Sequence, residues 1–172
     1  MPKVSLPRVL ALDLREHQYG YAIFEGPHLL LLWGLRQRSS LTGRRLRRHV
    51  SMLRSTFGFT SIVGRIRLRD RTPQAVTSRV AKAIIQFAQS ASVQLILIKA
   101  AEIRAHFGGM PKSSINRFVA GRFPELAWRL PPHRKLWHSE RRRQLIFDSV
   151  AVGIYFFDRL QSEEYAVPSV AS

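Results

Sequence analysis

Two aspartates stand in apolar surroundings, where a charged side chain needs a partner. Asp13 follows the run Val9-Leu10-Ala11-Leu12, and Asp148 lies in a segment that is apolar on nearly all sides of a helix. A buried carboxylate is costly unless a cation or hydrogen bonds compensate its charge. Two carboxylates brought together by the fold provide the oxygen ligands that Mg²⁺ or Mn²⁺ prefers, and such sites hydrolyse phosphodiesters. Both aspartates are therefore candidate metal ligands and catalytic residues.

Each aspartate also has a simpler interpretation. Asp13 can begin a turn and accept hydrogen bonds from its own loop. Asp148 can form an ion pair with Arg142 or Arg143 earlier in its helix, or with Arg104 from elsewhere in the chain. The residue types alone leave these alternatives open.

Glu140 is a third acidic candidate for the catalytic set, eight residues before Asp148. Eight residues advance an α-helix by two turns and about 80°, so Glu140 can flank a site at Asp148 but cannot overlie it. The interpretation we favour for Glu140 is a carboxylate that stabilises the N-terminal end of the helix through the helix dipole.

An alternation of strands and helices positions these acids. Three apolar segments at 8–14, 19–24 and 28–36, joined by short connections, predict an antiparallel meander. Further apolar patterns predict a helix over 39–57, a strand over 61–68, a helix over 74–90, a strand over 93–98, and helices over 111–123 and 139–160. Such alternation favours parallel strands with crossover helices. We expect an α/β protein with a mixed five-stranded sheet, antiparallel in its first three strands and then parallel, with helices on both faces.

Both ends of the chain carry motifs of a known superfamily. The stretch Val9-Leu10-Ala11-Leu12-Asp13, then Tyr19-Gly20-Tyr21-Ala22-Ile23-Phe24-Glu25-Gly26 and Trp33-Gly34, resembles the opening of RuvC-like nucleases, Holliday-junction resolvases of the ribonuclease H superfamily. A bacterial RuvC-like branch is similar to the C-terminal stretches Phe123-Pro124-Glu125-Leu126, Leu130-Pro131-Pro132, Trp137-x-Ser139-Glu140 and Ile146-Phe147-Asp148. The resemblance extends over about residues 8–157. It implies a ribonuclease H-like fold, Mg²⁺ or Mn²⁺ as cofactor, branched DNA or structured RNA as substrate, and a homodimer.

The resemblance also implies an acidic metal site, which this chain has only in part. Asp13 matches the acid of the first strand, and Asp148 matches the acid of the C-terminal helix. The glutamate expected at the end of the fourth strand falls near Val63-Gly64-Arg65, and the acid expected one turn before Asp148 falls at Leu145. Two of the four ligands therefore remain, with Glu140 as a stand-in for a third.

Two functions follow from this partial match. The first is a metal-dependent endonuclease, which activates a water for attack on phosphorus. The second is a catalytically inactive module that binds nucleic acid, since Arg65 and Arg141 place positive charges where acids are expected. An actin-like ATPase is a remote third class, because that superfamily also opens with a strand ending in Asp. No Gly-rich phosphate loop follows the later strands, which disfavours it.

Arginine dominates the charge of the chain. The 172 residues include 28 Lys+Arg and 11 Asp+Glu, a net charge of +17, and 23 of the cations are Arg. A folded domain this basic normally binds a polyanion, and the guanidinium group forks onto phosphate. Residues 36–71 contain eleven arginines and one acid, Asp70. We predict nucleic acid as partner, DNA rather than RNA, bound by Arg44, Arg45, Arg47, Arg48, Arg65, Arg67, Arg69, Arg141, Arg142 and Arg143.

The remaining composition excludes several classes. The chain has no Cys, so it has no disulfide, no Cys-ligated zinc and no Cys nucleophile. No apolar run reaches the about 20 residues of a membrane-spanning helix. We expect a single domain over 1–160 with a C-terminal tail over 161–172, in a cytoplasmic protein. Trp128 and Trp137 lie in the connector before the last helix, where packing onto the core is favoured over stacking on bases.

Overall fold

A sheet of five strands, in the order β3-β2-β1-β4-β5, forms the centre of the molecule. The computed structural model describes residues 6–15, 18–37, 43–66, 74–131 and 142–165. The strands are β1 (Arg8–Leu14), β2 (Gln18–Glu25), β3 (Leu29–Gln37), β4 (Ser61–Ile66) and β5 (Gln94–Leu97). Pairing is antiparallel from β1 to β2 and from β2 to β3, and parallel from β1 to β4 and from β4 to β5. The predicted mixed sheet is confirmed.

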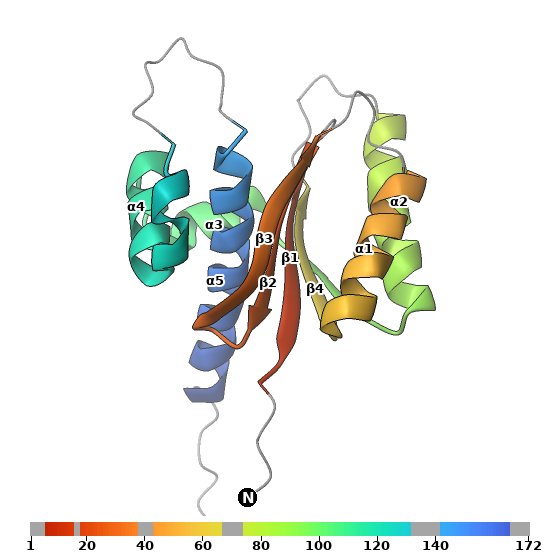
Figure 1. Ribbon diagram of the computed structural model, residues 1–172, viewed down its shortest axis with the longest axis horizontal. Coiled ribbons are helices and arrows are strands. Elements are labelled where there is room, and N and C mark those ends of the chain that lie inside the picture. The colour runs from red at the N-terminus through yellow and green to blue at the C-terminus, as the bar shows by residue number, and fades with distance from the viewer. Residues whose placement is uncertain (1–5, 16–17, 38–42, 67–73, 132–141, 166–172) are drawn as a thin grey trace, which may run out of the picture.

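Helices cover both faces of this sheet (Figure 1). One face carries α1 (Gly43–Phe57) and α2 (Gln74–Ser90). The other carries α3 (Ala100–His106), α4 (Lys112–Arg122), the 3-10 helix η1 (Pro124–Arg129) and α5 (Gln144–Tyr165). Helices on both faces are what the sequence predicted.

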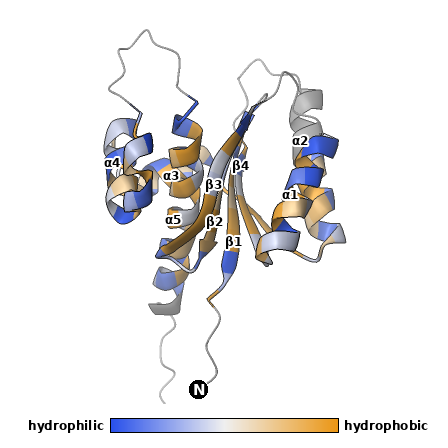
Figure 2. Cartoon of the chain, viewed as in Figure 1, coloured by the Kyte–Doolittle hydropathy of each residue, from blue (hydrophilic) through white to orange (hydrophobic). Residues whose placement is uncertain are grey.

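The central strand β1 is buried on both of its faces. Successive side chains of a strand point to opposite faces. Leu10 and Leu12 therefore belong to the core cluster that includes Leu46 of α1, whereas Val9 and Ala11 belong to the cluster beneath α5. Figure 2 shows the resulting apolar strands, with hydrophilic residues at their ends. Residue 13 shares the face of Val9 and Ala11, so the Asp13 side chain points to the α5 layer.

Two glycines allow α5 to approach the sheet closely. A Cβ atom on Gly20 of β2 would collide with the carbonyl group of Leu145, and a Cβ on Gly153 of α5 would collide with the ring of Phe24. Gly20 is also the register partner of Asp13 in the neighbouring strand. The close approach at Gly20 therefore places the first turn of α5 beside the end of β1.

The elements differ from the predicted ones in three places. Helix α3 was not predicted, because it has seven residues and buries only Ile103, which gives no periodic pattern. The predicted connector after Phe123 forms η1. Helix α5 begins at Gln144 and continues past the predicted end at Leu160 to Tyr165, while the predicted start at 139 lies outside the described residues.

Trp128 does not pack onto the core as expected, since it is 65% exposed. The connector folds as η1 with Leu126 fully buried, which leaves Trp128 directed outward. Trp137 lies outside the described residues. Within the part of the chain that the structure describes, no helix combines the length and the apolar character needed to cross a membrane.

Candidate functional site

The ends of β1 and β4 lie side by side and place an acidic and a basic residue opposite each other in the ladder. Asp13 is the Cα partner of Arg65 in the parallel ladder, and both side chains point to the α5 face. Asp13 is completely buried, and Arg65 is 7% exposed. The Nε of Arg65 donates to Oδ1 of Asp13 at 3.2 Å, and its Nη2 donates to Oδ2 at 3.3 Å. The guanidinium therefore forks onto both carboxylate oxygens, the strong bidentate geometry of an Arg–carboxylate pair.

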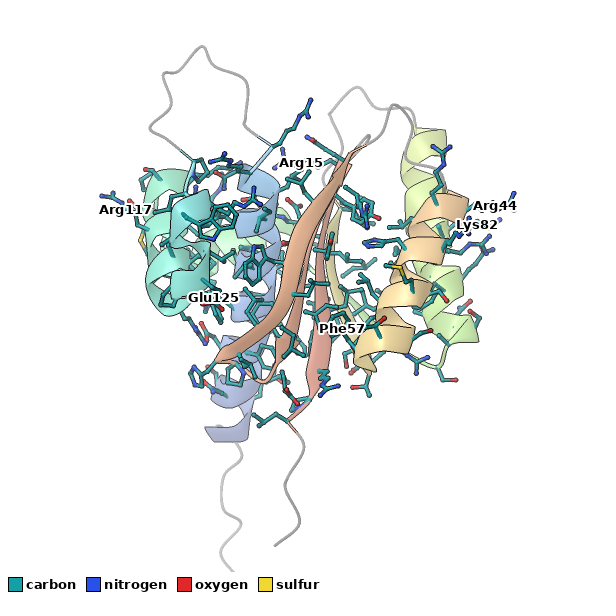
Figure 3. All side chains as sticks on the ribbon, viewed as in Figure 1. Arg15, Arg44, Phe57, Lys82, Arg117 and Glu125 are labelled. Carbon is teal, nitrogen blue, oxygen red and sulfur yellow. The ribbon has the colours of Figure 1, made fainter. Side chains whose placement is uncertain are left out.

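A second arginine joins Asp13 to the acid of α5. Arg15 directly follows β1, and its Nη2 donates to Oδ2 of Asp148 at 2.7 Å. The same nitrogen lies 3.7 Å from Oδ2 of Asp13. Nη2 of Arg65 lies 3.8 Å from Oδ1 of Asp148. In Figure 3, Arg15 lies at the upper end of the sheet, beside the first turn of α5. We call Asp13, Arg15, Arg65 and Asp148 the ion network.

Two amide side chains, one from α4 and one from α5, stabilise the position of Asp148 in the ion network. Gln144 donates from Nε2 to Oδ1 of Asp148 at 3.1 Å. Gln144 and Asn116 of α4 also exchange two hydrogen bonds, at 2.8 and 2.9 Å, and both residues are buried. Lys112, at the start of α4, places its Nζ 3.9 Å from Oδ2 of Asp148. Asp148 is thereby oriented by α4 and by the end of β1 together.

The structure brings together the two acids that sequence reasoning selected. Asp13 and Asp148 share Arg15 and Arg65, so they meet at one end of the sheet as expected. Leu145 is fully buried against Gly20, and Gly64 is buried beside Leu97, so neither position supplies a further acid. Glu140, Arg141, Arg67 and Arg69 lie outside the described residues.

The partners of these acids were mostly not predicted. Arg142 and Arg143, two of the alternative ion-pair partners considered for Asp148, are exposed, and the short contact of Asp148 is with Arg15. Sequence reasoning did not select Arg15, although residues 13 and 15 share one face of an extended chain. It also did not select Gln144, Asn116 or Lys112.

The ion network does not provide the donor set of a divalent-metal site. Both carboxylates are held by guanidinium groups, and Lys112 adds a third cation, which gives two acids against three bases. Mg²⁺ needs octahedral oxygen ligands that are free to coordinate, and neighbouring positive charges oppose its binding. Among the described residues no group of three or more His, Asp and Glu side chains could hold a metal. The residues present therefore do not fit Mg²⁺ or Mn²⁺.

A separate basic surface lies on α1. Leu46, Val50 and Leu53 of α1 are buried against the sheet. The opposite face of α1 exposes the predicted phosphate ligands Arg44, Arg45, Arg47 and Arg48. We call these four residues the α1 arginine face. In Figure 3, Arg44 of α1 and Lys82 of α2 point away from the sheet. Arg65 is different, because it is buried and held by Asp13, which removes it from the surface that can meet phosphate.

Comparisons with known proteins find solved structures of similar fold. No family of related sequences and no curated protein matches the chain. Among solved structures, Thermus thermophilus RuvC in complex with a Holliday junction substrate is 15% identical, with a TM-score of 0.67 over 90% of this chain and 96% of that chain. Another structure of Thermus thermophilus RuvC is 14% identical, with a TM-score of 0.66 over 90% and 96%. Fowlpox virus resolvase with its substrate Holliday junction DNA is 13% identical, with a TM-score of 0.56 over 88% and 99%.

These similarities span nearly the whole of each chain, and at 13–15% identity they are similarities of fold. They agree with the strand order, the mixed pairing and the helices on both faces of the sheet. The resemblance inferred from the sequence motifs is confirmed at the level of the fold: the chain has the ribonuclease H-like fold of RuvC.

Proposed function

We propose that this protein binds nucleic acid, with branched DNA as its substrate class, and does not cut it. The observation that carries the proposal is the fork of Arg65 onto both oxygens of Asp13. A carboxylate held in this way cannot coordinate a metal unless the guanidinium leaves. The leaving guanidinium would then be a buried cation without its partner, which is strongly unfavourable.

The binding part of the proposal rests on charge. The net charge is +17, and the α1 arginine face exposes four guanidinium groups along a single helix. Cations on one face neutralise successive phosphates and release their counterions, which supplies affinity without reading sequence. Thermus thermophilus RuvC and fowlpox resolvase, which share the fold, are seen with Holliday junctions, and this supports branched DNA.

A metal-dependent endonuclease is the second candidate. The observation that favours it is the meeting of Asp13 and Asp148 at the end of β1, since both lie within 4 Å of Arg15. For this activity Arg15 and Arg65 would have to withdraw from the carboxylates when substrate and metal bind.

One experiment separates the two candidates. Labelled four-way junction, duplex and single-stranded DNA are mixed with the protein at low salt, with EDTA, Mg²⁺ or Mn²⁺. We expect binding in all three conditions by fluorescence anisotropy, with junction bound most tightly, and intact strands on a denaturing gel. Absence of binding at low salt would contradict the proposed function. Cleavage that requires metal and disappears in Asp148→Asn would establish the endonuclease instead.

A pair of matched variants tests where the DNA binds. Arg44→Gln with Arg48→Gln removes two charges from the α1 arginine face. Lys99→Gln with Arg104→Gln removes two exposed charges near and on α3. The proposal expects the first variant to bind more weakly and the second to bind nearly as the wild type does. Equal losses in both would show that net charge, rather than the α1 arginine face, determines binding.

A further inference from the structure

Trp128 is the most exposed large apolar side chain among the described residues, with 65% of its surface open. Isolated exposed apolar residues are common on proteins, but tryptophan is the side chain with the largest apolar surface to leave in water. It lies in η1, a short helix whose Leu126 is fully buried and anchors it to the core. The indole is therefore held outward by a well-packed element.

One face of this indole is already covered by a cation. The guanidinium carbon of Arg129 lies 3.9 Å from the centroid of the Trp128 ring. Arginine stacks on aromatic faces in this way and keeps the ring in a fixed orientation. Because one face is covered and most of the side chain is still exposed, the exposed area belongs to the opposite face and the edge of the ring. A flat apolar group can stack on this exposed area.

The surroundings of Trp128 favour a polyanion. From residue 110 to residue 131 the chain carries Lys112, Arg117, Arg122 and Arg129 against one acid, Glu125. Helices α4 and η1 pack against each other, and α4 begins with Lys112, which lies 3.9 Å from Asp148. In Figure 1 the last described residues of η1 and the first turn of α5 lie at the same end of the molecule. The element that carries Trp128 therefore packs on α4, the helix that begins beside the ion network.

We propose that Trp128, backed by Arg129, is a stacking platform for an unpaired nucleobase. An exposed aromatic face among cations is how proteins bind single-stranded nucleic acid, because every base has a π-face to stack. The assignment deepens the proposed function and rests on it: unpaired bases are present at branch points and in single-stranded arms but not within a duplex. Trp128 would thus give the protein a preference that charge alone cannot give.

The test compares two oligonucleotides that differ only in their bases. One is a labelled thymidine homopolymer, and the other is an abasic oligonucleotide of the same length and charge. We expect the wild type to bind the homopolymer more tightly. Trp128→Ala should reduce affinity for the homopolymer by roughly 5- to 150-fold and leave affinity for the abasic strand unchanged, the range expected for one stacked base. Trp128→Phe should recover part of the loss, because it retains a ring.

Phe118→Ala is the matched control, since Phe118 of α4 is an aromatic side chain that is 45% exposed. We expect it to bind both oligonucleotides as the wild type does. Circular dichroism melting curves verify that each variant folds. Equal affinity of wild type and Trp128→Ala for the homopolymer would overturn the stacking site and leave the proposed function standing. Failure of the wild type to bind the junction at low salt would overturn the proposed function itself, whereas binding of the junction but of neither oligonucleotide would overturn only the stacking site.

Discussion

At the scale of single residues, the ion network determines which chemistry this end of the sheet can support. Its four side chains come from the end of β1, from β4 and from α5, and Asp13 is completely buried. Removing one partner of a buried pair typically costs about 3–5 kcal/mol, because the remaining charge is uncompensated. The two arginines therefore stabilise the junction of three elements as well as neutralise the acids. A divalent cation would have to displace both of them.

Exchanging the two arginines of the ion network should create affinity for a divalent metal. Arg65→Glu combined with Arg15→Gln places a third carboxylate in register with Asp13, because residues 13 and 65 are partners in the β1–β4 ladder. We expect Mn²⁺ to raise the melting temperature of this variant and to leave that of the wild type unchanged. Saturation at 100 times the dissociation constant corresponds to about 2.7 kcal/mol of stabilisation.

Adding Asp13→Asn to the same variant is the control, since it removes a ligand and should abolish the effect of Mn²⁺. The prediction fails if Mn²⁺ stabilises the wild type as much as the variant. That result would show that the arginines yield to metal.

The sequence predicted the two acids of this network but not their partners, and there is a physical reason for the difference. Asp13 and Asp148 were recognisable because each is a charge within an apolar pattern. The role of Arg15 was detectable in principle, since strand periodicity places it on the face of Asp13. The bidentate contact of Arg65 was not detectable, because it depends on the register between β1 and β4, which are separated in the chain by two strands and a helix. The Asn116–Gln144 amide pair likewise joins residues whose proximity no local pattern reports.

At the scale of elements, the packing of α5 on β2 determines where Asp148 lies. Long apolar periodic segments predicted β1, α1, α2 and β4 well, because their patterns extend over several turns or a full strand. The seven-residue helix α3 was too short for such a pattern. The close approach of α5 at Gly20 and Gly153 was also not predicted, since a glycine in the sequence does not reveal which backbone or ring will occupy the space.

Two glycine substitutions of opposite expected sign test this packing. Gly153→Ala adds a methyl group that collides with the ring of Phe24, which is fully buried. Overpacking of this kind destabilises by about 1–3 kcal/mol. Gly121 of α4 has nothing within 4 Å of its added Cβ, so Gly121→Ala should stabilise through helix propensity alone, by up to about 1 kcal/mol. Urea unfolding of both variants measures the difference, and a neutral Gly153→Ala would contradict the close approach.

The contact between α1 and β2 makes stability depend on pH. Burial, together with the nearby charge of Arg36, lowers the pKa of His49 from 6.5 to about 4. Nδ1 of His49 lies 2.8 Å from the hydroxyl of Tyr19, and the ring packs edge-on against Tyr21. The unfolded chain binds a proton at His49 below pH 6.5, whereas the folded protein does so only near pH 4. Folding free energy should therefore be lost as the pH falls between these values, by about 1–3 kcal/mol.

The matched variant is His49→Gln, which keeps a polar group beside Tyr19 and cannot be protonated. Carboxylates titrate in the same pH range, so the informative quantity is the difference in unfolding free energy between wild type and variant. We expect the unfolding free energy of the wild type to fall relative to that of the variant as the pH is lowered from 7 to 4. A difference independent of pH would show that His49 titrates normally.

At the scale of the whole molecule, positive charge is distributed over distinct surfaces. The α1 arginine face belongs to the helix layer on one side of the sheet. Trp128 and its neighbouring cations belong to α4 and η1, in the helix layer on the other side. A branched nucleic acid has several arms and can contact both sides at once, whereas a short duplex contacts one. The homodimer implied by the resemblance stays a prediction, which light scattering of the protein with and without junction DNA would test.

The dependence of affinity on salt reports how many phosphates the protein neutralises. On duplex DNA the slope of log K against log salt is about −0.9 for each phosphate contacted. Arg44→Gln with Arg48→Gln should therefore make the slope shallower by up to about 1.8 if both side chains contact phosphate. Lys99→Gln with Arg104→Gln lowers the net charge equally and should leave the slope unchanged, because those residues lie away from the α1 arginine face. Identical slopes for all three proteins would place the phosphates elsewhere on the molecule.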